Sequence, residues 1–271
     1  MRSAYREKRS LCGENYMEVD LYPVYKQSRS RRVKMKPSTE AQVKLNQRRA
    51  ERKLEMLIKT NFTPDDIKCE LTYRPENHPE SEEAAQKCIQ NFTRRMKYFR
   101  ERHGLSKLKY IHVTEKGSRK GRYHHHIIMS GGVSPREIAE IWGLGYVQKI
   151  QPLQFDEFGV VGIAKYMCKQ MVFGKRWCAS RNLKKPTESK NDSKYSRRKV
   201  IQVSEHMDDR EYIEALYPGW HLGDCRRFGF GTVKEMYLTI RLYKPWKDGN
   251  NEHQYHRKRT RSDPHAPRGR T

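Results

Sequence analysis

Residues 108–130 read LKYIHVTEKGSRKGRYHHHIIMS, and this stretch decides the fold. An apolar run with alternating polar positions is followed by a short loop with two glycines and by a second apolar run. Alternation is typical of β-strands, and a short glycine-containing loop between two strands predicts a hairpin. We therefore predict strands over 108–115 and 123–130, joined by a loop over 116–122.

The segments on either side of this hairpin extend the pattern. Two further stretches alternate as strands do, at 67–73 and 145–153, and three show helical spacing of apolar residues, at 80–103, 134–142 and 160–172. The resulting order is β-α-β-β-α-β-α, and its first six elements match the ferredoxin-like split βαβ arrangement. We predict an α+β fold: an antiparallel sheet with helices on one face, the other face free for a ligand, and basic N- and C-terminal extensions.

The segments outside this core are basic. Residues 1–62 are predicted as an N-terminal extension that lacks a clear period up to residue 38 and has one helix over 39–60; it either contacts phosphates or serves as a disordered solubilising arm. The core spans 63–175. Residues 176–243 are predicted as a basic loop with additions to the core, including a helix over 208–216 and a strand over 233–243, and 244–271 as a disordered basic tail.

Charge and cysteine content restrict the class of protein. The 271-residue chain has 57 Lys and Arg against 32 Asp and Glu, a formal net charge of +25, which indicates a polyanionic partner such as a nucleic acid. Its six cysteines form no C-x-x-C pair, which argues against a cysteine zinc site. Neither a signal peptide nor an apolar run of about 18 residues is present, so we expect no membrane contact and a cytoplasmic location.

The histidine run suggests a metal site. Because alternate residues of a strand share a face, His124 and His126 point to one side and His125 to the other. Glu115 ends the preceding strand, and hairpin pairing would bring it close to His124. Two histidines and one carboxylate are a ligand set of zinc hydrolases and of non-haem iron oxygenases, so ligand type alone fixes neither metal nor reaction. A histidine cluster that binds no metal is the alternative.

Tyr166 and Lys169 lie three residues apart on the predicted helix 160–172, and therefore on the same helix face. A tyrosine that faces a metal-bound phosphate can act as a nucleophile, and a nearby lysine can stabilise charge on the phosphate or on the departing oxygen. The alternative is a tyrosine whose ring packs in the core.

Together these motifs resemble those of the HUH endonucleases, in particular the rolling-circle replication initiators of bacterial plasmids and single-stranded DNA phages. The resemblance covers roughly residues 65–175. It rests on motifs that occur in the family's order: CELTYRP (69–75), IHVTE (111–115), YHHHIIM (123–129) and YMCK (166–169).

This resemblance implies a divalent metal, Mg²⁺ or Mn²⁺, held by Glu115, His124 and His126, and a nucleophilic Tyr166. It implies nicking and rejoining of single-stranded origin DNA through a 5′-phosphotyrosine, with a free 3′-OH that primes replication. Gly162 and Gln170 flank Tyr166 at four residues, which indicates a single-tyrosine enzyme. No G-x-x-x-x-G-K-[ST] motif occurs, so a host helicase and DNA polymerase, in a host bacterium, would be needed.

The loop after the tyrosine helix is a candidate DNA contact. Its Trp177 can stack on an unpaired base or anchor the C-terminal part in the core. Its basic residues would neutralise phosphates; they are Lys175, Arg176, Arg181, Lys184 and Lys185.

Other functions stay open at this point. A relaxase or a single-stranded DNA transposase would use the same chemistry, although relaxases usually have the tyrosine before the histidines. A non-catalytic DNA-binding protein would have the same charge. An iron oxygenase would share the ligands, but the charge argues against it. The sequence does not indicate an oligomeric state.

Overall fold

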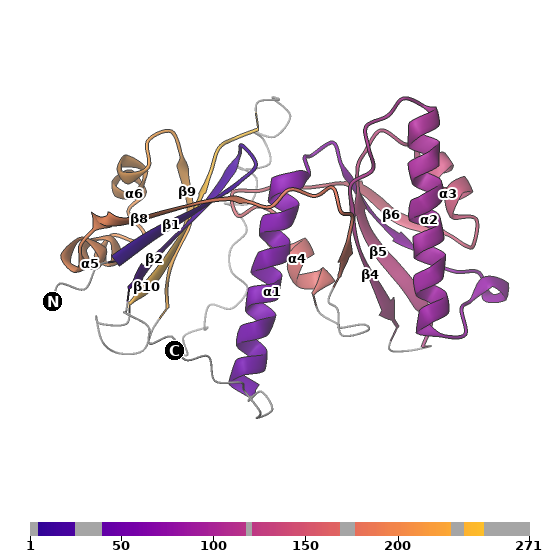
Figure 1. The fold of residues 1–271 in the computed structure, drawn as a ribbon, viewed down its shortest axis with the longest axis horizontal. Helices are drawn as coiled ribbons and strands as arrows, with labels where there is room; N and C mark the ends of the chain where they lie inside the picture. Colours follow the sequence, from indigo (N-terminus) through magenta and orange to yellow (C-terminus); the bar gives the residue numbers. More distant parts are fainter. Residues whose placement is uncertain (1–4, 25–39, 118–120, 169–176, 229–235, 247–271) are drawn as a thin grey trace, which may run out of the picture.

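The computed structural model describes residues 5–24, 40–117, 121–168, 177–228 and 236–246. Two five-stranded antiparallel sheets lie side by side, with helix α1 (Glu40–Asn61) between them (Figure 1). We call them sheet A, with strand order β8-β1-β2-β10-β9, and sheet B, with order β6-β3-β5-β4-β7. Within the described residues, no helix is both long enough and apolar enough to cross a membrane.

Sheet B confirms the predicted α+β fold. Its elements follow one another as β3 (Ile67–Leu71), the 3₁₀ turn η1 (Pro75–Asn77), α2 (Glu82–Arg102), β4 (Tyr110–Lys116), β5 (Tyr123–Met129), α3 (Pro135–Trp142) and β6 (Val147–Pro152). The short β7 (Cys178–Ala179) pairs with β4 at the edge. Each predicted element from 67 to 153 is present within a few residues, and Ser134 caps α3 in a capping box with Glu137.

The two faces of sheet B pack against different helices. On one face, Ile127 and Met129 of β5 pack with Phe92 of α2 and Trp142 of α3. On the other face, Ile128 of β5 belongs to a cluster contributed by α1 and by α4 (Val161–Met167). The second face is therefore not entirely free, because two helices cover its apolar half.

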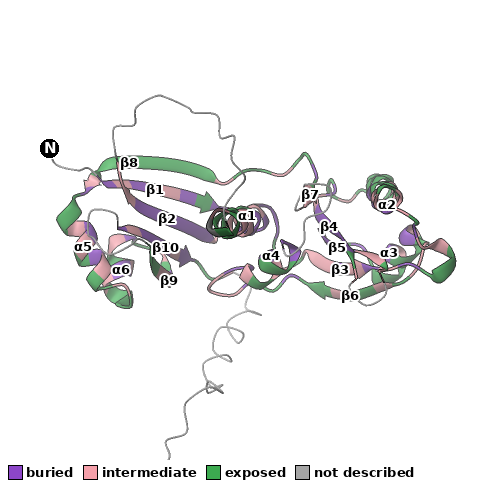
Figure 2. Cartoon of the chain, turned by 90° about the horizontal axis from the view of Figure 1, so that it is seen from below, coloured by how far each residue is buried: buried purple, intermediate pink, exposed green. Residues whose placement is uncertain are grey.

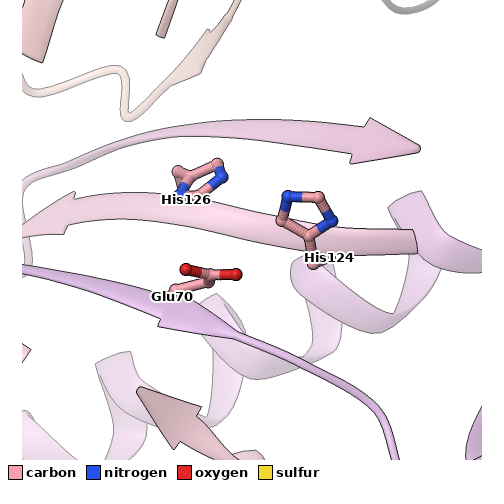
Figure 3. Close-up of side chains that lie close together, drawn as sticks. All are labelled: Glu70, His124 and His126. Carbon is pink, nitrogen blue, oxygen red and sulfur yellow. The ribbon is translucent and has the colours of Figure 1, made fainter. Parts of the chain in front are cut away.

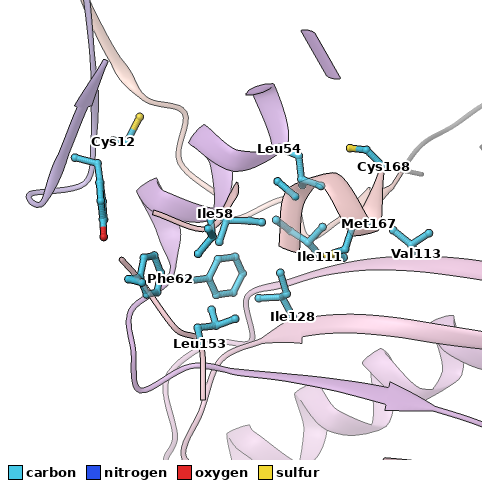
Figure 4. Packing of buried hydrophobic residues seen from close by; sticks show 14 of the residues in the cluster. Cys12, Leu54, Ile58, Phe62, Ile111, Val113, Ile128, Leu153, Met167 and Cys168 are labelled. Carbon is cyan, nitrogen blue, oxygen red and sulfur yellow. The ribbon is translucent and has the colours of Figure 1, made fainter. Parts of the chain in front are cut away.

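This second cluster, shown in Figure 4, joins the two halves of the protein. Leu54 and Ile58 of α1 are fully buried against Ile111 and Ile128 of sheet B. The same cluster includes Cys12, from the end of β1 in sheet A. Helix α1 thus packs against sheet B through its apolar side.

Sheet A was not predicted. It is formed by β1 (Tyr5–Cys12), β2 (Tyr16–Pro23), β8 (Thr187–Tyr195), β9 (His221–Phe228) and β10 (Tyr237–Tyr243), with α5 (Arg197–Glu205) and α6 (Arg210–Leu216) on one face. The predicted helix 208–216 and strand 233–243 correspond to α6 and β10. Figure 2 shows that β1 and β2 are largely buried, whereas the edge strand β8 is exposed.

The expectation that residues 1–38 lack regular structure is wrong for residues 5–23. The reason is that charged side chains occupy buried positions and hide the apolar alternation. Glu7 of β1 is buried and accepts hydrogen bonds from Lys194 and from the Tyr217 hydroxyl. Glu18 and Asp20 of β2 are buried too, and Arg52 of α1 donates to both, at 2.6 and 2.8 Å.

A network of ion pairs therefore holds α1 to sheet A. Besides the Arg52 contacts, Lys59 of α1 pairs with Glu55 and lies 3.7 Å from Glu18, and Arg241 of β10 lies 3.4 Å from Glu55. Loss of one partner leaves a buried charge uncompensated, which typically costs about 3–5 kcal/mol. The helix is thus held on one side by apolar packing and on the other by paired charges.

We predict that Leu54→Ala lowers the free energy of unfolding by about 2–5 kcal/mol, because it opens a cavity at a fully buried position between α1 and sheet B. Val43→Ala, at a position of the same helix that is 51% exposed, is the control and should change stability little. Urea unfolding followed by circular dichroism measures both, and equal effects would contradict the packing described for α1.

Candidate metal and tyrosine site

Two histidines of β5 and a glutamate of β3 meet on the polar half of sheet B (Figure 3). Glu70 pairs directly with His126 across the antiparallel β3–β5 ladder, and His124 lies two residues from His126 on the same face. One carboxylate oxygen and one nitrogen from each ring lie within 4.8 Å of one another. This spacing is that of a group of ligands around a single ion.

Glu115 flanks the histidines from the other side. It pairs with His124 in the β4–β5 ladder, as the hairpin predicted, and its Oε2 lies 3.5 Å from His124 Nε2 and 3.6 Å from His126 Nε2. Burial acts to raise the pKa of this carboxyl, but the hydrogen bonds from the two histidines outweigh burial and lower the pKa to about 2. Its Oε1 is buried and has no hydrogen-bond partner among the described residues.

The strand β5 therefore lies between two carboxylates. Glu115 was predicted from the sequence, because the hairpin is local and its register follows from a short loop. Glu70 was missed, although it lies within the motif CELTYRP. Its place beside His126 depends on the pairing of β3 with β5, two strands far apart in the sequence.

His125 points to the opposite face, as predicted from strand alternation. It is fully buried, with Nε2 2.6 Å from the Tyr73 hydroxyl and Nδ1 2.9 Å from the Thr114 hydroxyl. Burial holds the pKa of His125 well below its usual value, so the ring is neutral. Both ring nitrogens have partners in the layer beneath the site, and His125 takes no part in the metal-binding face.

Tyr166 reaches the site from α4. Its hydroxyl lies 3.0 Å from His126 Nε2, and the two rings meet edge to face at 4.7 Å. The side chain is 47% exposed, so it is not a core tyrosine. Burial of the hydroxyl, with Glu115 and Glu70 nearby, raises the pKa of Tyr166 above its usual value. The second predicted residue of this motif, Lys169, lies outside the described residues.

A cavity of about 320 Å³ adjoins the tyrosine. Its lining includes Glu70 and His126 of the candidate metal site, Tyr166 and Gly162 of α4, and Lys149 of β6. The cavity thus extends from the histidines across β3 to the edge strand, beside the exposed hydroxyl.

The predicted DNA-binding residues are not gathered at this site. Trp177 is partly buried against the cluster around α1, which favours its interpretation as a core anchor. Arg181, Lys184 and Lys185 are exposed near the start of β4, where Asn182 donates to the Leu108 carbonyl. At roughly 3.3 Å per residue this position is on the order of 20 Å from Glu115. Lys175 and Arg176 lie outside the described residues.

Comparison with known families connects this part of the chain with DNA replication. Residues 67–172, which include the three motif strands and α4, match the model of a family described as replication-associated protein ORF2. No curated protein matches the chain, and no solved structure matches it. The matched segment contains each of the site residues Glu70, Glu115, His124, His126 and Tyr166.

We predict that the metal-free protein binds one Mn²⁺ and that Glu70→Gln and Glu115→Gln each weaken this binding. Loss of an outer-shell partner alone costs about 10–100-fold in metal affinity, so removal of a direct ligand should cost at least roughly tenfold. Isothermal titration calorimetry measures the affinity. Glu140→Gln, on α3 beyond the other face of the sheet, is the control. Unchanged affinity in His126→Ala would rule out a metal at this position.

A second prediction concerns His112, buried in the layer with His125. Burial lowers the pKa of His112 to about 4, and its Nδ1 has no partner among the described residues. The unfolded chain binds a proton near pH 6.5, which the folded protein takes up only near pH 4. Stability should therefore fall as the pH is lowered across this interval, by up to about 3 kcal/mol for this residue.

His112→Leu removes the titrating group from this apolar surrounding. We expect its free energy of unfolding to fall less than that of the wild type between pH 7 and pH 4.5, in urea unfolding at both values. An identical pH dependence in the two proteins would contradict the prediction.

Proposed function

We propose that this protein is a rolling-circle replication initiator that nicks and rejoins single-stranded DNA through a covalent 5′-phosphotyrosine on Tyr166. The observation that carries the proposal is the exposed Tyr166 hydroxyl 3.0 Å from His126, within a set of two histidines and two carboxylates. The match of residues 67–172 to a replication-associated family supports it.

The residues of the site fit a divalent cation. Glu70, Glu115, His124 and His126 offer carboxylate oxygens and imidazole nitrogens, and the buried Glu115 Oε1 lacks a hydrogen-bond partner among the described residues. Two carboxylates make the set richer in oxygen than the predicted one, which suits Mg²⁺ or Mn²⁺. When bound, such a cation would polarise the scissile phosphate.

The proposed nicking step is a transesterification. The Tyr166 oxygen attacks phosphorus, the bond from phosphorus to the 3′ oxygen breaks, and the phosphate stays on the enzyme as a 5′-phosphotyrosine. The phenol loses its proton to solvent, which the exposed side chain contacts, and the departing 3′ oxygen takes up a proton to become a 3′-OH. Attack of a 3′-OH on the phosphotyrosine reverses the step and rejoins the strand.

Neighbouring carboxylates oppose this step in the free protein. The negative charges of Glu115 and Glu70 raise the pKa of Tyr166, after burial, and disfavour the phenolate. Positive charge placed on these carboxylates would remove that effect. Lys169 is proposed to stabilise charge on the phosphate or on the departing oxygen. Single-stranded origin DNA, a host helicase and a host DNA polymerase are the proposed partners, with Arg181, Lys184 and Lys185 contacting DNA away from the cleavage point.

Tyr166→Phe tests the proposal. We expect the wild type, incubated with Mn²⁺ and labelled single-stranded oligonucleotides that tile its own replicon, to form a covalent adduct visible on a denaturing gel. Tyr166→Phe should form none and still bind the DNA, because only the attacking oxygen is lost. Tyr98→Phe, at an exposed tyrosine of α2, makes the same substitution far from the site and should form adduct normally.

Two outcomes would count against this function. Adduct formation at the wild-type rate by Tyr166→Phe would remove Tyr166 as the nucleophile. Tight DNA binding by the wild type with no adduct on any oligonucleotide would favour a non-catalytic DNA-binding protein.

A further inference from the structure

Lys149 of β6 differs from its neighbours in backbone conformation. Among the residues that the structure describes, it is the one non-glycine residue with a positive φ, 52°. A side chain with a Cβ is strained in this left-handed region, which glycine enters freely. Lysine at such a position therefore calls for an explanation.

The strain belongs to a β-bulge in the β3–β6 pairing. Lys68 pairs with Gln151 and Glu70 pairs with Gln148, so β6 has one more residue between these pairs than β3 has. In regular alternation, the residue after Gln148 would point away from the face that carries Glu70. The bulge instead brings the Lys149 side chain to this face, with its Nζ 2.7 Å from Glu70 Oε2.

Stability alone does not account for this lysine. Its side chain is 70% exposed, and an exposed ion pair contributes little to folding. Glycine or asparagine would adopt the same backbone with less strain. Backbone strain retained beside a reactive group is typical of functional sites, and Lys149 lines the same cavity as Tyr166 and His126.

We propose that Lys149 is a phosphate-binding residue of the nicking site, whose ammonium group binds a non-bridging oxygen of the DNA strand in the cavity beside Tyr166. This inference rests on the proposed function. When Glu70 serves as a metal ligand, its carboxylate is shared or lost to Lys149, and the ammonium group is available to a phosphate. The charge then lies on β6, a strand whose sequence contains no recognised motif.

Lys149→Gly is the decisive variant, because glycine relieves the backbone strain and the variant should fold at least as well as the wild type. Loss of one phosphate contact should reduce the slope of log affinity against log salt by about 0.7 for single-stranded DNA. It should also slow adduct formation by about 10- to 100-fold, the usual effect of losing a charged hydrogen bond. Fluorescence anisotropy with a labelled oligonucleotide, without metal, measures the slope.

Two further variants serve as controls. Lys149→Arg keeps the positive charge and should keep the wild-type salt slope. Lys87→Ala removes one positive charge from the exposed surface of α2, on the other side of sheet B, and should leave both the slope and the adduct rate unchanged.

A residue that only positions Glu70 would behave differently. Mn²⁺ titration of the DNA-free protein separates the two roles: our proposal expects Lys149→Gly to bind Mn²⁺ as tightly as the wild type or more tightly, because a competing cation is gone. Weaker Mn²⁺ binding, or an unchanged salt slope, would overturn the proposal. Absence of adduct in the wild type itself would instead refute the proposed function and leave the DNA-binding arm to decide on Lys149.

Discussion

The alternation of side chains along β5 is the constraint on which the structure depends. This strand lies at the centre of sheet B and is paired on both sides, so each of its residues is committed to one face. His125, Ile127 and Met129 enter the core with α2 and α3, whereas His124, His126 and Ile128 face α1 and α4. A shift of one residue would exchange the two sets, placing the metal-binding rings in the core and the neutral His125 on the surface.

The same alternation divides the second face into an apolar and a polar half. Ile111 and Ile128 lie at one end of β4 and β5 and support α1 and α4, and Glu115, His124 and His126 lie at the other end. Because α4 packs on the apolar half, Tyr166 projects over the boundary and reaches His126. The tyrosine is therefore positioned by hydrophobic packing, and the ligands by strand register.

Sequence patterns predicted what is local and missed what depends on distant pairing. Sheet B and Glu115 were predictable because their signals, apolar alternation and a short hairpin loop, come from neighbouring residues. The strands of sheet A were not, because Glu7, Glu18 and Asp20 occupy buried positions that a pattern of polarity assigns to the surface. Glu70 requires the β3–β5 register, and Lys149 requires a bulge that breaks the alternation on which strand prediction relies.

The chain order of sheet A has a consequence for how the protein forms during synthesis. Its strands β1 and β2 come first and β8, β9 and β10 come last, so the whole of sheet B is inserted between them. Thr239 donates to Asp20 across 219 positions of the chain. A two-stranded hairpin is marginal by itself, and pairing over such a separation is slow. The first hairpin made must therefore wait for the last strand, and sheet B, which carries the histidines and Glu115, can be complete before Arg241 arrives to bond Glu55 of α1.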